Sequence, residues 1–351
     1  MGREENITED EAALYDRQIR LWGLDAQRRL RAARVNKMPV LLVGVKGLGA
    51  EVAKNIVLAG IKSITLLDSS LVDDEDCTSH FLVSKADLGK NRAESSLHRV
   101  QLLNPMVQVT ADSGDVDGKD DAFFTNFDVV CVTCCPAATQ CRINKFCAEN
   151  SIQFFSGDVF GYYGYMFSDL GEHEYAEEVP NTKAKPAEDE ETDEPSPKKA
   201  KTEEPETVVV KKCMTFKRLE NALSVDWSLD DMKKKLRRTP NTYFIMEVLL
   251  DFYGKHKRRP LIKSKAEDVT DLNGIRETTL ERLKVDKKVV PEDFASFCFA
   301  ELSPVCAVVG GVLGQEIIKA VSQKDQPHNN FFFYNGIDGN GMVDNIGSSQ
   351  H

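Results

Sequence analysis

Three glycines and an aspartate are the residues in this sequence whose spacing points most clearly to chemistry. Gly44, Gly47 and Gly49 follow the apolar stretch Val40–Val43 and precede a segment with helical spacing. Glycines at such a turn let a phosphate approach backbone N–H groups and the N-terminus of the next helix. Asp68 follows about 20 residues later, where a carboxylate that binds ribose belongs. The pattern indicates a nucleotide site, or alternatively a turn that needs glycine only for its geometry.

The cysteines are a second set of residues that could do chemistry. Cys131 and Cys134 have CxxC spacing, but no second CxxC pair completes a zinc site. They lie in an apolar run that predicts a buried strand, in which side chains three apart point to opposite faces. We interpret them as packing residues, as we do Cys213, Cys298 and Cys306 beside other apolar stretches, and we expect no metal site.

Strands and helices that alternate along the chain must position these residues. The apolar patterns predict helices at 9–34, 45–60, 91–103 and 137–150, and strands at 40–44, 62–68, 107–112, 127–134 and 152–156. This alternation predicts an α/β fold, a Rossmann-like parallel sheet with helical crossovers. Residues 157–170 alternate glycine with aromatic residues, and we expect them to form strands that leave the sheet.

The segment 176–207 has a different composition. It contains five prolines, no aromatic residue, and 11 acidic residues against 5 lysines. Such a segment cannot bury enough surface to offset its ordering entropy, so we predict that it is disordered. Three parts follow: 1–175 begins the α/β domain, 176–207 is an acidic linker, and 208–351 completes the domain. In the last part we predict helices at 243–252, 291–302 and 304–321 and a strand at 330–336.

Composition excludes several functional classes. The 351 residues carry a net charge of −11, which argues against a nucleic-acid partner. No apolar run approaches the roughly 18 residues that span a bilayer, so we expect no membrane association. The polar, acidic start Met1–Asp10 resembles neither a signal peptide nor a transit peptide.

A nine-residue string identifies a family. Residues 15–23 read Tyr-Asp-Arg-Gln-Ile-Arg-Leu-Trp-Gly, which resembles the signature of the enzymes that activate ubiquitin and ubiquitin-like proteins. Further stretches agree with this family in the same order, at 44–49, 91–93, 304–311 and 328–333. The resemblance covers most of the chain outside 176–207 and the helices after it. Within the family, the length and strings are most similar to the smaller subunit of the heterodimeric, SUMO-activating branch.

The resemblance implies a ThiF/MoeB-like adenylation fold and a division of labour. In this family an ATP-binding half adenylates the C-terminal carboxylate of the ubiquitin-like protein and releases pyrophosphate. A cysteine in a separate domain then takes the acyl group as a thioester and passes it to a conjugating enzyme. In the SUMO-activating branch the larger subunit holds ATP, magnesium and that cysteine. The resemblance therefore implies a chain that is inactive alone, with the larger subunit and SUMO as its partners.

Alignment with the family also implies that the nucleotide site of this chain is degenerate. Active members carry, after the strand-ending acid, an Asp, an Asn, an Arg, a Lys and a later Asp; here the residues are Ser70, Asp76, Ser79, Arg92 and Cys135. Serine cannot neutralise phosphate charge, Asp76 would repel it, and an uncharged cysteine cannot help to hold magnesium. Lys46 also stands where nucleotide-binding relatives carry a small residue. We therefore expect no cofactor at the degenerate site, Gly44, Gly47, Gly49, Asp68 and Arg92.

The resemblance still implies that this chain contributes one residue to catalysis. Arg17 matches the arginine that, in this family, reaches across the dimer toward the ATP phosphates of the active half. Its permanently charged guanidinium can stabilise the charge on leaving pyrophosphate. The alternatives are a solvated arginine paired with Asp16 or a neighbour in a pure scaffold, and a self-sufficient MoeB/ThiF-like adenylating enzyme. The last would need an intact catalytic set, often with paired CxxC zinc ligands.

Three further expectations concern location and assembly. The basic run Pro197–Lys201 fits either a nuclear import signal or a solvated linker, so we expect a nuclear protein with a possible cytoplasmic share. The dimer interface is expected around 304–321, because a pseudo-twofold axis requires matching patches on the two subunits. Asn36–Pro39 lengthens the connection before the first strand relative to the family, and we attach no function to it.

Overall fold

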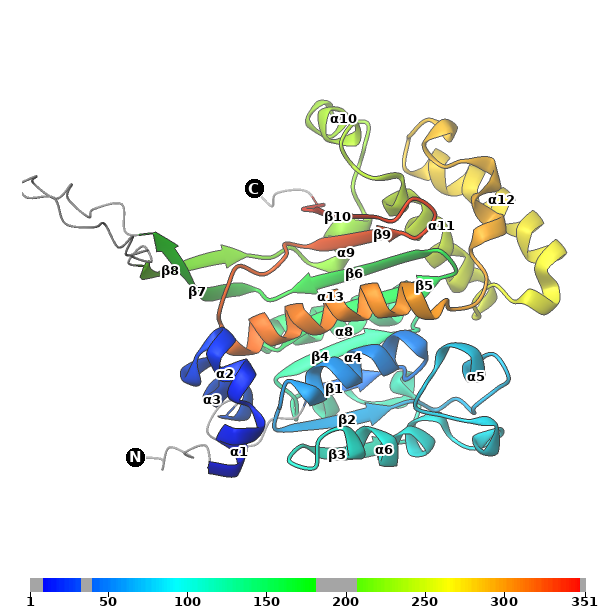
Figure 1. Cartoon of the computed structure of the whole chain (residues 1–351). Helices are drawn as coiled ribbons and strands as arrows, with labels where there is room; N and C mark the ends of the chain where they lie inside the picture. Colours follow the sequence, from blue (N-terminus) through cyan, green and yellow to red (C-terminus); the bar gives the residue numbers. More distant parts are fainter. Residues whose placement is uncertain (1–8, 33–39, 181–206, 348–351) are drawn as a thin grey trace, which may run out of the picture.

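The computed structural model describes residues 9–32, 40–180 and 207–347, and its centre is an eight-stranded sheet (Figure 1). The strand order is β10-β9-β6-β5-β4-β1-β2-β3. The strands are β1 (Val40–Val43), β2 (Ser63–Leu67), β3 (Gln108–Asp112), β4 (Val129–Thr133), β5 (Gln153–Phe160), β6 (Tyr163–Asp169), β9 (Phe331–Asn335) and β10 (Asn340–Asp344).

Helices cover both faces of this sheet (Figure 1). α4, α6 and α13 lie on one face, and α8 and α11 lie on the other. The helices are α1 (Glu9–Leu14), α2 (Asp16–Trp22), α3 (Leu24–Ala32), α4 (Gly47–Leu58), α5 (Asp76–Ser79), α6 (Arg92–Leu103), α7 (Asp121–Phe124), α8 (Ala137–Glu149), α9 (Leu219–Leu223), α10 (Asp230–Leu236), α11 (Asn241–His256), α12 (Lys265–Arg282) and α13 (Ser303–Ser322).

The predicted α/β fold is confirmed in the half of the sheet that runs from β5 to β3. These five strands are parallel, because helices such as α4 and α8 carry the chain back between them. Leu41 and Val43 point into the core on one face and Val40 and Leu42 into the core on the other, which explains the unbroken apolar run. The strand order reverses at β1, which lies between β4 and β2. In open sheets, ligands bind beyond the carboxyl ends of the strands at this point.

The expectation that 157–170 leaves the sheet is wrong. β5 extends to Phe160, and β6 returns antiparallel beside it and pairs with β9. The glycines of this stretch allow close packing: a Cβ on Gly164 would lie 2.6 Å from Val309 Cγ2 of α13, and one on Gly157 would lie 2.7 Å from the Tyr165 carbonyl oxygen of the neighbouring strand β6. The alternation of glycine and aromatic residues therefore reflects close packing both against α13 and between the strands.

Two predicted helices differ from the structure. The helix expected at 9–34 is three short helices, α1 to α3, and Gly23 with φ +86° separates the last two. The helix expected at 291–302 is one 3₁₀ segment, Glu292–Phe297, followed by irregular chain. The segment Asn36–Pro39 lies outside the described residues.

The acidic linker begins later than predicted. Residues Ala176–Pro180 are the end of strand β7 (Glu172–Pro180), and Thr207 begins β8 (Thr207–Thr215). The two strands pair with each other as an antiparallel arm outside the main sheet (Figure 1). The composition of 176–207 did not predict these strand residues, because β7 begins before this segment and β8 extends beyond it. The interval 181–206 lies outside the described residues.

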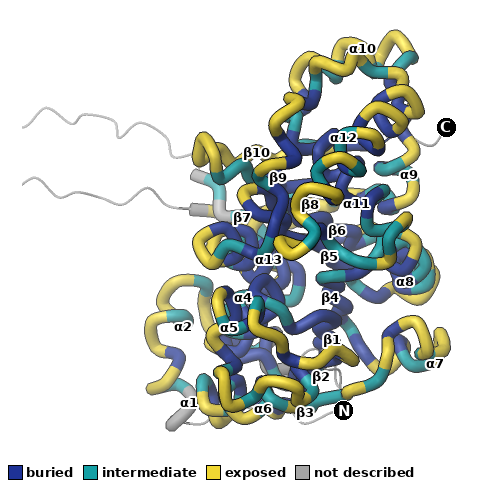
Figure 2. Tube along the Cα trace, turned by 90° about the vertical axis from the view of Figure 1, so that its right-hand side faces the viewer, coloured by how far each residue is buried: buried dark blue, intermediate teal, exposed yellow. Residues whose placement is uncertain are grey.

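The long apolar helix α13 belongs to the core. By length and composition it could cross a membrane. Instead it packs against α4 and strands β5 and β6, and most of its residues are buried. Figure 2 shows the central strands in dark blue, whereas α2 and α10 are largely exposed.

Candidate functional site

A cavity of about 350 Å³ lies at the carboxyl ends of β1, β2 and β4, where the fold predicts a ligand site. Gly44, Asp68, Ser70, Arg92 and Cys135 all contribute to its lining. The structure therefore brings together residues that the sequence pattern and the family alignment had singled out separately.

The glycine turn is shaped by contacts within the chain. Gly44 has φ +80°, and a Cβ there would lie 2.3 Å from the Thr133 carbonyl oxygen. A Cβ on Gly49 would lie 2.1 Å from the Gly44 oxygen. Thr133 Oγ1 donates a hydrogen bond of 2.7 Å to that same oxygen. Backbone packing alone therefore requires glycine at Gly44 and Gly49.

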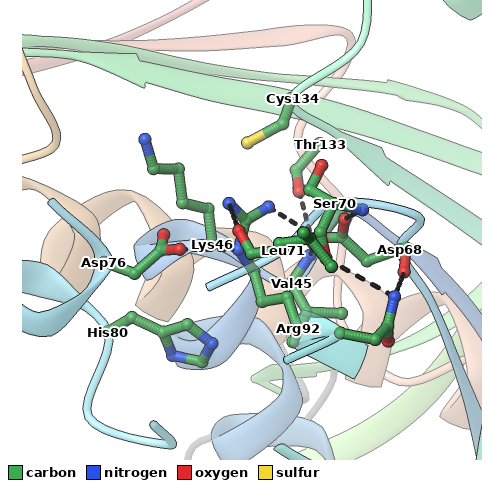
Figure 3. Close-up of polar contacts among 12 residues, drawn as sticks. Val45, Lys46, Asp68, Ser70, Leu71, Asp76, His80, Arg92, Thr133 and Cys134 are labelled. Carbon is green, nitrogen blue, oxygen red and sulfur yellow. Dashed lines mark hydrogen bonds and ion pairs between the residues drawn. The ribbon is translucent and has the colours of Figure 1, made fainter. Parts of the chain in front are cut away.

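Asp68 uses its carboxylate within the chain. Its Oδ2 accepts hydrogen bonds from Val45 N (2.8 Å) and from the Arg92 guanidinium (3.0 Å), and its Oδ1 accepts one from Ser70 N (2.9 Å) (Figure 3). Asp68 is therefore in the position expected for a ribose ligand, but both of its oxygens already have donors.

Arg92 is a buried bridge between two carboxylates. It pairs with Asp68 and, through Nε, with Asp76 Oδ2 at 3.0 Å. Burial alone would lower the pKa of Arg92, but the two carboxylates raise it above its ordinary value. The residue that stands in place of the family's lysine is therefore a fixed structural cation.

The neighbours of Arg92 are buried as well. Burial raises the pKa of Asp76, and its Oδ1 has no hydrogen-bond partner among the described residues. Burial, with the nearby Arg92, lowers the pKa of His80 to about 3, so this imidazole is neutral. His80 Nδ1 accepts from Leu82 N, and Nε2 lies 3.2 Å from Ser96 Oγ. Arg92, Asp76 and His80 therefore offer no unpaired positive charge to a phosphate.

A second charged cluster adjoins the cavity, and the sequence patterns missed it. Arg259 Nη1 lies 2.8 Å from Asp158 Oδ1, 2.9 Å from Glu301 Oε1 and 3.3 Å from Cys134 Sγ. Burial raises the pKa of Asp158 to about 6 and that of the Cys134 thiol well above its ordinary value. Arg259 and Glu301 follow no local motif, and only the folded chain brings them within reach of the glycine turn.

This cluster has the donor set of a metal site but holds a guanidinium. The ligand atoms of Cys134, Asp158 and Glu301 lie within 4.8 Å of one another. Arg259 Nη1 contacts all three, so it stands where a cation would otherwise have to sit. These residues therefore do not fit a metal ion.

Lys46, the unusual residue of the glycine turn, is also paired. Its Nζ lies 2.9 Å from Glu75 Oε2. Burial and the nearby Arg259 would lower the pKa of Lys46, but Glu301 and Glu75 outweigh them and raise it.

Arg17 lies far from this cavity. It is exposed on α2 and has no hydrogen-bond or ion-pair partner among the described residues, because Asp16 pairs with Arg20 instead. Tyr15, two residues before Arg17, is buried and packs on Gly60, just beyond the C-terminal end of α4. Since the 12 residues of α4 span about 18 Å, Arg17 and the glycine turn lie near opposite ends of that helix.

The other cysteines follow the packing interpretation, with one exception. Cys131, Cys298 and Cys306 are buried, and burial raises the pKa of each thiol. Cys213 is exposed on β8, so the prediction that it packs is wrong. The reason is that β8 belongs to the two-stranded arm and not to the main sheet.

Comparisons with known proteins agree on one family. The profile described as the ThiF family matches residues 15–350. SUMO-activating enzyme subunit 1 of Xenopus laevis is 53% identical over 97% of both chains. The proteins of the same name from Homo sapiens and Danio rerio are each 51% identical, over 97% of this chain and 96% and 97% of theirs. On a match that spans nearly its whole length, the chain belongs to the ThiF family.

Proposed function

We propose that this chain is the subunit of a SUMO-activating enzyme that completes the adenylation site of a larger catalytic partner. Relatives of that name share about half of its residues over nearly their full length, and this observation carries the proposal. The larger partner supplies ATP and magnesium binding, forms the thioester on its cysteine, and passes SUMO to the conjugating enzyme.

The cavity of this chain supports a subunit that is inactive alone. The residues present do not fit a nucleotide with magnesium: Arg92 is held between Asp68 and Asp76, and Cys135 is a buried thiol where active members carry an aspartate. We derive no catalytic step at this cavity. A self-sufficient MoeB/ThiF-like enzyme would need the residues that this chain lacks.

The contribution of this chain to catalysis is Arg17. Its guanidinium is exposed and unpaired among the described residues, and it lies away from the chain's own cavity. The leucines around it, Leu14, Leu21 and Leu24, are exposed to 53%, 74% and 41%, as expected of a surface that a partner covers. In the dimer, Arg17 stabilises negative charge on the pyrophosphate that leaves the partner's site.

ATP–pyrophosphate exchange with SUMO tests this proposal. The chain alone should show no exchange, and the mixture with the larger subunit should be active. In the mixture, Arg17→Ala should lower the exchange rate at least about tenfold, since loss of one charge-stabilising donor costs on the order of 10²–10³ in known cases.

Arg20→Ala is the matched control, because Arg20 is exposed on the same helix but pairs with Asp16. It should leave the rate within about twofold of wild type. An unchanged rate for Arg17→Ala in a stable dimer would leave a pure scaffold, and exchange by the chain alone would favour the self-sufficient enzyme.

The basic run Pro197–Lys201 directs the protein to the nucleus in this proposal. It lies outside the described residues. A fluorescent fusion of the full chain should concentrate in nuclei, and replacement of Lys198, Lys199 and Lys201 by alanine should spread it into the cytoplasm. A distribution that the triple replacement does not change would refute the signal.

A further inference from the structure

The N-terminus of α4 already has an anionic partner inside the chain. Leu48 N donates a hydrogen bond of 3.3 Å to Glu301 Oε2, and a Cβ on Gly47 would lie 2.5 Å from the same oxygen. A helix N-terminus favours a negative group because its first N–H groups are unpaired and its dipole is positive there. Glu301 therefore lies where the glycine turn would otherwise receive a phosphate.

Both the side chain and the backbone of Glu301 are held in place by contacts within the chain. Its side chain is fully buried, and its Oε1 accepts the hydrogen bond from Arg259. Its backbone forms a bridge with Gly161, next to the turn that joins β5 to β6. The carboxylate cannot move aside without separating from Arg259.

Arg259 is equally constrained. Besides Glu301 it pairs with Asp158, donates to the Val159 carbonyl oxygen, and lies 4.5 Å from the centre of the Phe160 ring. The cation nearest to Glu301 is therefore buried and paired with two carboxylates of this chain, and an incoming phosphate would have to compete with both.

The charges around the turn also disfavour a second anion. Three cations lie around it, Lys46, Arg92 and Arg259, against five carboxyl groups, Asp68, Glu75, Asp76, Asp158 and Glu301. A polyphosphate would bring more negative charge into a buried region that already carries an excess of acids.

We propose that Glu301 is a built-in substitute for phosphate that keeps phosphate and polyphosphate groups out of the glycine turn. Replacing it with a small residue removes the anion from the α4 N-terminus and one of the two carboxylates that Arg259 contacts, and it creates a phosphate-binding site. This inference rests on the proposed function and deepens it, because it attributes the inactivity of the chain's own site to a residue that is present as well as to those that are missing.

Binding of inorganic pyrophosphate to the full-length chain, measured by isothermal titration calorimetry without the larger subunit, tests the inference. Wild type should not bind it measurably. Glu301→Ala should bind at least about tenfold more tightly than wild type, which corresponds to about 1.4 kcal/mol. The matched control is Glu316→Ala, because Glu316 is also a buried glutamate but pairs with Lys319 on α13, whereas Glu301 pairs with Arg259 and the α4 N-terminus. It should gain no binding.

Thermal unfolding provides a second measurement. Glu301→Ala should melt below wild type in chloride, and pyrophosphate at equal ionic strength should raise its melting temperature but not that of Glu316→Ala. If Glu301→Ala cannot be obtained folded, Glu301→Ser leaves similar room and offers a hydroxyl beside Arg259.

Equal affinity of wild type and variant for pyrophosphate, or no gain in any Glu301 variant, would overturn the inference. The assay requires neither SUMO nor the larger subunit. Its failure is thus separate from a failure of the exchange experiment.

Discussion

Asp68 and Arg92 illustrate how single residues can keep a position while their chemistry changes. Each stands where the family pattern leads one to expect a ligand-binding group, yet they bind each other. Breaking a buried pair is costly because one charge is left without a partner. Asp68 and Arg92 are therefore important for stability, whether or not a ligand binds at this cavity.

Glu247 on α11 provides a prediction at the same scale. Burial raises its pKa to about 7, despite Arg282 Nη2 at 3.1 Å. The folded chain therefore keeps a proton that the unfolded chain releases between about pH 4.5 and about pH 7, so stability should fall as pH rises through this window. Glu247→Gln should remove up to about 3 kcal/mol of this fall.

Urea unfolding at about pH 5 and about pH 8 measures the difference. Glu292→Gln serves as the control, since Glu292 is exposed, and it should keep the pH dependence of wild type. A Glu247→Gln variant with the wild-type pH dependence would contradict the assignment.

Among the elements, α13 and β6 show how glycine permits close packing. Gly164→Ala should lower the free energy of unfolding by about 1–3 kcal/mol, because its Cβ would lie 2.6 Å from Val309 Cγ2. The opposite sign is expected for Gly274→Ala on α12, where no atom lies within 4 Å of the new Cβ. That change should stabilise the helix by about 0.5–1 kcal/mol. Denaturant melts of both variants would show whether the two effects differ in sign.

Elements with local signals could be predicted from the sequence. The apolar run of β1, the glycine turn and the α6 helix that ends before Asn104-Pro105 follow from neighbouring residues. The pairing of β6 with β9 could not be predicted, because it joins Tyr163 to Asn335 across the whole second half of the chain. β10 could not be predicted either, because it is mostly exposed and has no apolar run.

The same distinction holds for the candidate site. Gly44 and Asp68 directly follow the adjacent strands β1 and β2, and the motif that they belong to located the cavity. Glu301 and Arg259 reach it from segments more than 200 residues away from the turn, and nothing in their neighbours marks them. Local patterns therefore pointed to Gly44 and Asp68, but not to the side chains that approach the turn from distant parts of the chain.

For the whole molecule, the expectation of an interface at 304–321 remains a prediction. α13 is mostly buried inside this chain, with Ala307 and Val308 among its exposed residues. The exposed leucines beside Arg17 extend the candidate surface to α1–α3. Leu21→Asp should weaken association with the larger subunit by at least roughly tenfold without destabilising the free chain, since Leu21 is 74% exposed.

Leu102→Asp is the control, because Leu102 on α6 is similarly exposed, at 68%. It should leave association unchanged. Binding can be compared by titration of the purified larger subunit, and equal affinities for the two variants would place the interface elsewhere.

The pairing of β6 with β9 has a consequence for synthesis on the ribosome. Until residues 303–335 have emerged, β6 has no neighbour on its outer edge and no α13 across its face, although all of its residues end up buried. A nascent chain of about 300 residues therefore exposes a long apolar strand edge, a feature that promotes aggregation. Chaperone binding should accordingly be strongest late in translation and should end once β9 is free to pair.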